Sequence, residues 1–463
     1  MSEPIPLLRV SARGLLRRRG IWLPSAVILG LLSLVLSMLY LGANNDPVGS
    51  TKDLPIALVT SDRGTKVAGQ RIDLGAQIAT QITGSAELRD KVSWKKVDRR
   101  TADDLLARGK VFGALVIPED FSASVAALAG PPRHEPHPPT MTVLTNPAAG
   151  SFGSGMAAEI NRKVVSQASA QVGRVLTQQL GQQAAQRSES AHAGRPVAPA
   201  AAQLMIADPV KVNVEDGYPL GAHSGLGLSA FFYALVLVLG GMLGANVIHA
   251  QVDTALGYMA NDKGPFRLVK PTQHMTRMHH FVVCSVLMVV LSMLTSALAM
   301  AGAIGVVGID ASHLGMLWIF GTCATAAMGI TALALLAVLG TPGPIVSMLV
   351  LIGLAIPSAG ATIPLQALPD FYRFLAEFEP FRQVVDGVRS ILYFDARTDA
   401  GLGRAWTMTA IGFAVSLLLG LVLTRLYDRK GLHRSAPLRR SAAHPQAGAA
   451  GTEAHQVEGA ATV

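Results

Sequence analysis

The chain has 463 residues and a net charge of +9; half of its residues are apolar and only 15% are charged. Soluble domains carry about 25% charged residues, so this composition excludes an ordinary soluble globule and predicts an integral membrane protein. The two cysteines, Cys284 and Cys323, both lie in apolar runs, which excludes a disulfide-rich secreted scaffold.

Six stretches of the chain are long and apolar enough to cross a membrane as helices, for which about 20 residues are needed. The run from 311 to 369 has no charged residue and holds two of them, because the segment Gly340-Thr-Pro-Gly-Pro344 predicts a hairpin in its middle. The six predicted spans are residues 21–43, 226–248, 281–309, 314–339, 344–360 and 405–424.

Basic residues next to the six spans predict that both termini face the cytoplasm. Residues 1–20, 249–280 and 425–463 fall on the cytoplasmic side and together carry the whole net charge of +9. This charge indicates topology and contact with anionic lipid. It does not indicate a nucleic-acid partner, because the basic residues are scattered at membrane flanks without interleaved aromatic residues.

Residues 44–225 are predicted to form a large extracytoplasmic domain with an α/β fold, because strand and helix patterns alternate there. Apolar positions 74, 78 and 82 predict one helix, Thr101 is the predicted N-cap of another, and a short helix follows Phe121. Apolar or alternating runs predict strands at 54–60, 92–97, 111–117, 140–145 and 210–214.

Residues 153–187 predict one long helix with an apolar stripe along one face. Two interpretations stay open: the helix covers the sheet, which is the simpler one, or it projects as a coiled arm. Residues 188–202 are interpreted as a linker, and residues 361–404 as an external helical segment. Residues 425–463 are predicted to be a cytoplasmic, disordered tail, and its part from about residue 435 is rich in alanine, glycine and polar residues.

Sequence motifs of enzymes are absent from the chain. No GxxxxGKS or GxxxxGKT loop, HExxH or GxSxG occurs, and we identify no paired His/Cys arrangement, so no catalytic residue, cofactor or metal site is predicted. His274, His279 and His280, with Met275 and Met278, are interpreted as interfacial residues at the mouth of the third span rather than as metal ligands. The predicted spans contain no Asp, Glu, Lys or Arg, which disfavours a proton-driven pump, since such pumps need ionisable groups in the membrane.

The order of the predicted elements along the chain, together with several short segments, resembles one family of membrane proteins. An arginine-rich leader precedes the first span, a large external domain follows it, and five further spans close the chain. The matching segments are 53–64 (DLPIALVTSDRG), 113–121 (GALVIPEDF), Asn146-Pro147 and 225–244. Over about residues 5–430 the chain is similar to the type-2 ABC exporter permeases, in particular the YhgE/phage-infection-protein branch, although the more usual Pro-Tyr is here Ala230-Phe-Phe-Tyr233.

The resemblance implies a homodimeric or heterodimeric permease in the plasma membrane of a bacterial cell. A separate cytoplasmic ABC ATPase would drive it with ATP, and it would export a hydrophobic or amphipathic substrate. It also implies an elbow helix at residues 4–19 and a coupling loop at 249–280 that the ATPase contacts. The predicted ATPase contacts in this loop are Asp253, Asp262, Lys263 and Arg267. The alternative is that these charges only set the topology.

A second function stays open beside the exporter. The external domain and its long helix are also compatible with a non-transporting membrane scaffold of a secretion apparatus, or with a surface protein that resembles a phage receptor. Neither function makes the chain itself an enzyme, because any ATPase activity would belong to a partner.

Overall fold

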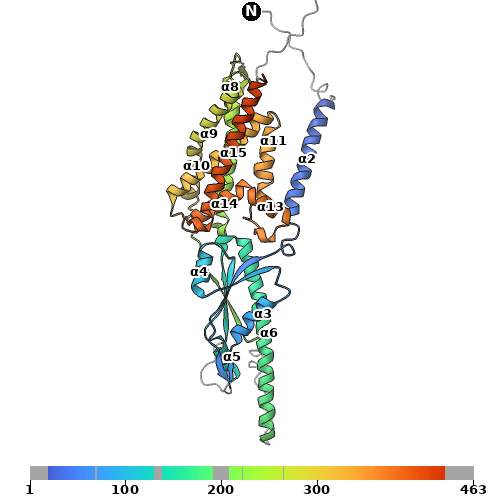
Figure 1. Ribbon diagram of the computed structural model, residues 1–463, viewed down its shortest axis with the longest axis vertical. Coiled ribbons are helices and arrows are strands. Elements are labelled where there is room, and N and C mark those ends of the chain that lie inside the picture. The colour runs from blue at the N-terminus through green and yellow to red at the C-terminus, as the bar shows by residue number, and fades with distance from the viewer. Residues whose placement is uncertain are drawn as a thin grey trace, which may run out of the picture.

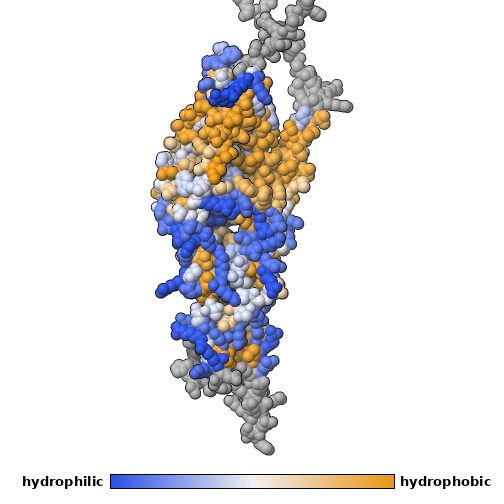
Figure 2. All heavy atoms as spheres, in the orientation of Figure 1, coloured by the Kyte–Doolittle hydropathy of each residue, from blue (hydrophilic) through white to orange (hydrophobic). Residues whose placement is uncertain are grey.

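The computed structural model describes residues 19–67, 70–129, 138–190, 208–221, 223–263, 265–268 and 270–432. The predicted elbow helix, except Arg19, lies outside these residues, as does most of the predicted linker. The predicted disordered tail lies outside them from residue 433 on, but its beginning is wrong, because residues 425–429 continue the last helix of the bundle. The described residues form two parts that are stacked end to end, a helix bundle and an α/β domain (Figure 1). Figure 2 shows that hydrophobic residues dominate the visible face of the bundle, whereas mostly hydrophilic residues cover the same face of the α/β domain.

Five helices in the described part of the chain are long and apolar enough to cross a membrane. By length and composition they correspond to five of the six predicted spans. Four of them, α8, α9, α10 and α15, pack against one another, while α2 stands beside the bundle (Figure 1). The five helices are α2 (Arg19–Ala43), α8 (Ser229–Ala255), α9 (Arg277–Met300), α10 (Leu314–Leu339) and α15 (Leu402–Arg429).

The sixth predicted span is a shorter, interrupted apolar segment, Gly343–Ser358. It consists of α11 (Gly343–Met348), a π-helical turn at Leu349–Gly353 and α12 (Ala355–Ser358). Pro357 has no N–H to donate and its ring crowds the carbonyl four residues earlier, which accounts for the departure from α-helical geometry at Gly353.

A five-stranded mixed sheet forms the centre of the α/β domain, in the order β4-β1-β5-β6-β7. Strands β4, β1 and β5 are parallel, β6 runs antiparallel to β5, and β7 is parallel to β6. All five predicted strands are confirmed, whereas the hairpin of β2 (Thr65–Val67) and β3 (Gln70–Ile72) was not predicted. The sheet strands are β1 (Leu54–Thr60), β4 (Val92–Lys96), β5 (Gly113–Ile117), β6 (Thr140–Thr145) and β7 (Lys211–Asp216).

Helices cover both faces of this sheet. Alternate residues of a strand point to opposite faces, and apolar residues on each face pack against helices. Leu58 faces a core shared with α3 (Leu74–Gly84), α5 (Phe121–Ala129) and α6 (Ser151–Ser190). The opposite face packs against α4 (Arg99–Ala107). Helix α6 packs into the core beside the sheet as far as Leu176 and then runs on beyond it (Figure 1), so each interpretation of the long helix describes a part of it.

The N-cap prediction for α4 is wrong. Asp98 occupies the cap position, and its carboxylate accepts a hydrogen bond of 3.2 Å from the backbone N–H of Thr101. Thr101 therefore lies inside the first turn. The carboxylate of Asp98 accepts a hydrogen bond from a first-turn N–H that has no partner within the helix. The helix therefore begins directly after Asp98 and before Thr101.

Two short helices, α13 (Asp370–Phe378) and α14 (Pro380–Tyr393), lie where the bundle meets the α/β domain (Figure 1). The hydroxyl of Tyr393 donates to the carbonyl of Ser224 and accepts from the N–H of Ala230, at 3.2 and 3.1 Å. These bonds fix the start of α8 against α14. The ring of Phe394 also contacts Tyr218, with centroids 5.7 Å apart, so the chain leaving the sheet is packed onto this junction.

Candidate functional site

The candidate site is the end of the bundle remote from the α/β domain, here called the loop end (Figure 1). It consists of the end of α8, the start of α9, the end of α15 and the connection at 256–276. Helix α8 runs on to Ala255 and α9 begins at Arg277. The loop between these helices is therefore shorter than the predicted 249–280, and Asp253 lies on a helix.

A small hairpin forms the outer part of this connection. Strand β8 (Asn261–Lys263) pairs antiparallel with β9 (Phe266–Leu268), and Asp262 is opposite Arg267 in the register. Phe266 and Leu268 are 71% and 53% exposed, and Arg267 between them is also exposed. Three of the four predicted contact residues thus lie on this hairpin, beside two apolar side chains that no part of the described chain covers.

The base of the hairpin is held close to the end of α8. Gly257 has a φ of +76°, and a Cβ at this position would lie 2.7 Å from the carbonyl oxygens of Lys270 and Pro271, so glycine is required by both backbone conformation and space. The hydroxyl of Tyr258 donates to the carbonyl of Gln273 at 2.8 Å. These contacts hold the two ends of the connection together, next to the end of α8 and the start of α9.

Helix α15 contributes an N-terminal cap to α9. The two carboxylate oxygens of Asp428 accept hydrogen bonds from the backbone N–H groups of Arg277 and Met278, both at 2.9 Å. The Arg277 side chain in turn donates to the carbonyl of Leu432 at 2.6 Å and lies over the ring of Tyr427. A negative charge at a helix N-terminus is stabilising, and this cap couples α9 to α15.

Asp253 lies in the interior of the loop end and not on its surface. Its side chain is 7% exposed; Oδ1 lies 2.9 Å from Nε2 of His280, and Oδ2 lies 3.5 Å from Nε2 of His249. Of the four residues predicted to contact an ATPase, Asp253 is thus separated from the hairpin residues. Any effect of Asp253 on a partner would pass through the packing of α8 against α9.

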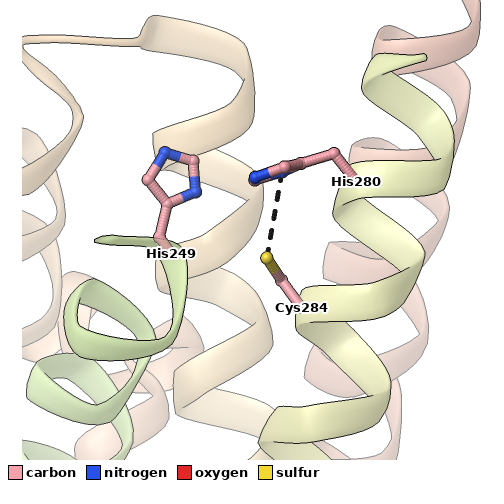
Figure 3. Close-up of side chains that lie close together, drawn as sticks. All are labelled: His249, His280 and Cys284. Atoms are coloured by element: carbon pink, nitrogen blue, oxygen red, sulfur yellow. Dashed lines mark hydrogen bonds between the residues drawn. The ribbon is translucent and has the colours of Figure 1, made fainter. Parts of the chain in front are cut away.

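Cys284 extends this buried cluster by one helical turn. Its Sγ lies 3.8 Å from Nδ1 of His280, and one ligating atom each of His249, His280 and Cys284 lies within 4.8 Å of the others (Figure 3). The sequence-based statement that no paired His/Cys arrangement exists is therefore wrong, because His280 and Cys284 are four residues apart on α9. His274 and His279, which were considered with His280, are exposed.

A small cavity of about 30 Å³ adjoins the histidines of this cluster. It lies beside His249 and His280 and reaches Arg277 and Gly340. Its volume is close to the share of one molecule in liquid water, about 30 Å³. The loop end therefore has room for a single small ligand next to two imidazole rings.

A second hollow lies in the α/β domain, between α3 and α6. This groove has a volume of about 540 Å³ and is lined by apolar side chains such as Ile78 and Val164, together with polar ones such as Gln171 and Arg174. A surface that combines apolar and polar side chains in this way is suited to another polypeptide.

The comparisons with known proteins give one match. A family model described as "Protein of unknown function (DUF3533)" matches residues 25–417, which include the α/β domain, the hairpin and the cluster of His249, His280 and Cys284. No curated protein and no solved structure matches the chain. Asp428, which caps α9, lies beyond the matched residues.

Proposed function

The chain belongs to the DUF3533 family, and from this premise we propose that it is the membrane permease subunit of an exporter driven by a separate ATPase. The observation that carries the proposal is the exposed hairpin at the loop end. It presents Phe266, Arg267 and Leu268 on a base that is tied to both α8 and α9. Aromatic and arginine side chains are typical of the centres of protein interfaces.

A force applied to this hairpin would reach most of the bundle. The connection joins α8 to α9 directly, and the Asp428 cap passes a displacement of Arg277 on to α15. At the other end, Tyr393 joins the start of α8 to α14 and so to the α/β domain. This continuous path supports a subunit in which a partner at one end changes the bundle and the domain at the other.

The proposal includes the topology and the assembly. Gly343–Ser358 would be the sixth membrane segment, both termini would be cytoplasmic, and the α/β domain would lie outside a bacterial plasma membrane. The substrate would be hydrophobic or amphipathic, and two such permeases would form a dimer. In this arrangement Asp262, Lys263 and Arg267 would be contacts for the ATPase, while Asp253 would act inside the bundle.

The proposal is tested by altering the hairpin in the full-length protein. Phe266→Ala with Arg267→Glu should lower co-purification of the ATPase encoded nearest to this protein by at least tenfold, which corresponds to about 1.4 kcal/mol. It should also abolish ATP-dependent uptake of a fluorescent amphiphile into inverted vesicles. The matched control is Lys66→Glu, an exposed charge reversal on the β2–β3 hairpin of the α/β domain. If no ATPase binds the wild-type chain and uptake is the same in all variants, the proposal fails.

A second candidate function rests on the groove between α3 and α6 and on the part of α6 that runs beyond the sheet. These features would suit a non-transporting scaffold of a secretion apparatus or a receptor-like surface protein. Replacing residues 178–207 by a short Gly/Ser linker should then abolish capture of the external partner, while the hairpin variant should bind it normally. Normal capture without residues 178–207 would dispose of this candidate.

A further inference from the structure

We infer that His249, His280 and Cys284 form a binding site for a borderline transition-metal ion of the Zn²⁺ or Co²⁺ class. The three side chains come from two neighbouring helices, α8 and α9, and point toward one another (Figure 3). Nitrogen and sulfur ligands of this kind select such ions over Mg²⁺ and Ca²⁺, which prefer oxygen ligands. The inference does not depend on the proposed export function.

The spacing of the ligand atoms fits a tetrahedral site. His280 and Cys284 are four residues apart on α9 and so share one face of the helix. Bond lengths of about 2.0 Å to nitrogen and 2.3 Å to sulfur at a tetrahedral angle require an N···S distance of roughly 3.5 Å. The distance from Nδ1 of His280 to Sγ of Cys284 is 3.8 Å, and His249 lies within 4.8 Å of both ligating atoms, so rotations of the side chains suffice to close the site.

Asp253 would act as a positioning residue for His280. Its Oδ1 lies 2.9 Å from Nε2 of that ring, on the side opposite the nitrogen that faces Cys284. A proton held on Nε2 by this carboxylate leaves the lone pair of Nδ1 available to the metal. Carboxylates in this position are common behind metal-bound histidines, where they fix the tautomer and the orientation of the ring.

The charge of the bound cluster matches that of a divalent ion. Cys284 and His280 are 1% and 3% exposed, and Asp253 is 5% exposed. Once Cys284 binds as a thiolate, it and the Asp253 carboxylate, which is paired with His280, carry two negative charges in a buried cluster. A dication held by the thiolate and two neutral imidazoles would neutralise both. The proton of the Cys284 thiol would be released to solvent when the metal binds.

Three protein ligands leave the fourth position of a tetrahedral site open. The cavity of about 30 Å³ beside His249 and His280 has room for one water there. Arg277, which also borders the cavity, is engaged by the carbonyl of Leu432 and the ring of Tyr427. A bound ion would join α8 to α9 immediately before the hairpin connection and so stiffen the loop end.

The test is a titration of the purified full-length protein in detergent with Co²⁺, whose thiolate complexes give a charge-transfer band in the near ultraviolet. We expect one Co²⁺ per chain, with the band removed by excess Zn²⁺. Cys284→Ser should abolish the band, and His249→Gln should weaken binding. The matched controls, Cys323→Ser and His274→Gln, should keep it, because neither residue belongs to the cluster. Asp253→Asn should keep the band with an affinity about 10–100-fold lower.

A second measurement needs no variant and so does not depend on whether the substituted proteins fold. Stoichiometric Zn²⁺ should slow alkylation of Cys284 in the wild-type chain and leave the rate at Cys323 unchanged. The inference is overturned if the folded wild-type protein shows no charge-transfer band, if the band persists in Cys284→Ser, or if Zn²⁺ does not protect Cys284.

Discussion

Glu379 is a buried carboxyl group at the N-cap of α14. Its Oε1 and Oε2 accept hydrogen bonds from the backbone N–H groups of Phe381 and Arg382, at 2.9 and 2.7 Å. Burial nevertheless raises the pKa of Glu379 to about 7, because these bonds and the charge of Arg382 offset the loss of hydration only in part. The residue therefore makes the stability of the junction dependent on pH.

The sign of this dependence follows from proton binding. With a pKa near 7 in the folded chain against 4.5 for the free group, the folded state binds more protons between those values. Stability should therefore fall as the pH rises from about 4.5 to about 7, by roughly 3 kcal/mol. Glu379→Gln should flatten this slope in thermal unfolding of the detergent-solubilised protein. The exposed neighbour Glu377→Gln is the control and should keep the wild-type slope. An unchanged slope in Glu379→Gln would contradict the assignment.

Helix α15 offers a matched pair of glycines that tests how closely its neighbours pack. A Cβ at Gly420 would lie 2.2 Å from Cζ of Phe281, a residue that is 1% exposed, whereas a Cβ at Gly412 meets nothing within 4 Å. Gly420→Ala should destabilise the bundle by about 1–3 kcal/mol through overpacking. Gly412→Ala should be neutral or stabilise it by up to about 1 kcal/mol, since alanine favours helix.

Unfolding midpoints of both variants in one detergent would compare the same substitution in the same helix. Equal shifts for Gly412→Ala and Gly420→Ala would show that helix propensity dominates, and would be incompatible with the close contact between α15 and α9.

Elements that depend on local pattern could be predicted from the sequence. The run without charge at 314–339 corresponds to α10, and the apolar run at 54–60 corresponds to β1. The end of α8 was placed too early, at residue 248. The polar residues that follow indicate a loop, and the burial of Asp253 against His280 became visible only in three dimensions.

The candidate site depends on contacts between residues that are far apart in the sequence, and local sequence patterns do not predict such contacts. Asp428 caps α9 from 150 residues away, and His249 meets His280 only because α8 packs on α9. The spacing of His280 and Cys284 on α9 was a local signal that could have been recognised, since residues four apart share a helix face.

At the scale of the whole molecule, four charged side chains join the α/β domain to the bundle. Asp104 of α4 and Arg108, which caps the end of α4, face Arg397 and Asp399, which follow α14. Arg108 Nη1 lies 3.4 Å from Asp399 Oδ2, and Arg397 Nη2 lies 3.6 Å from Asp104 Oδ1. The side chains are 35–47% exposed, and exposed pairs contribute only about 0.2–1 kcal/mol each, so the pairs act together with the apolar contacts of Phe394.

Reversing the charges on one side of this junction should loosen the attachment of the domain without changing either part. Asp104→Arg with Arg108→Asp keeps opposite charges within α4 but places like charges against Arg397 and Asp399. Hydrogen exchange of the amides at 392–400 should then accelerate by up to about fivefold per pair, and more at low salt, where screening is weakest. Adding Arg397→Asp and Asp399→Arg should restore the wild-type rate. If the fourfold variant exchanges as fast as the double one, the charges do not hold the two parts together, and the junction depends on apolar packing alone.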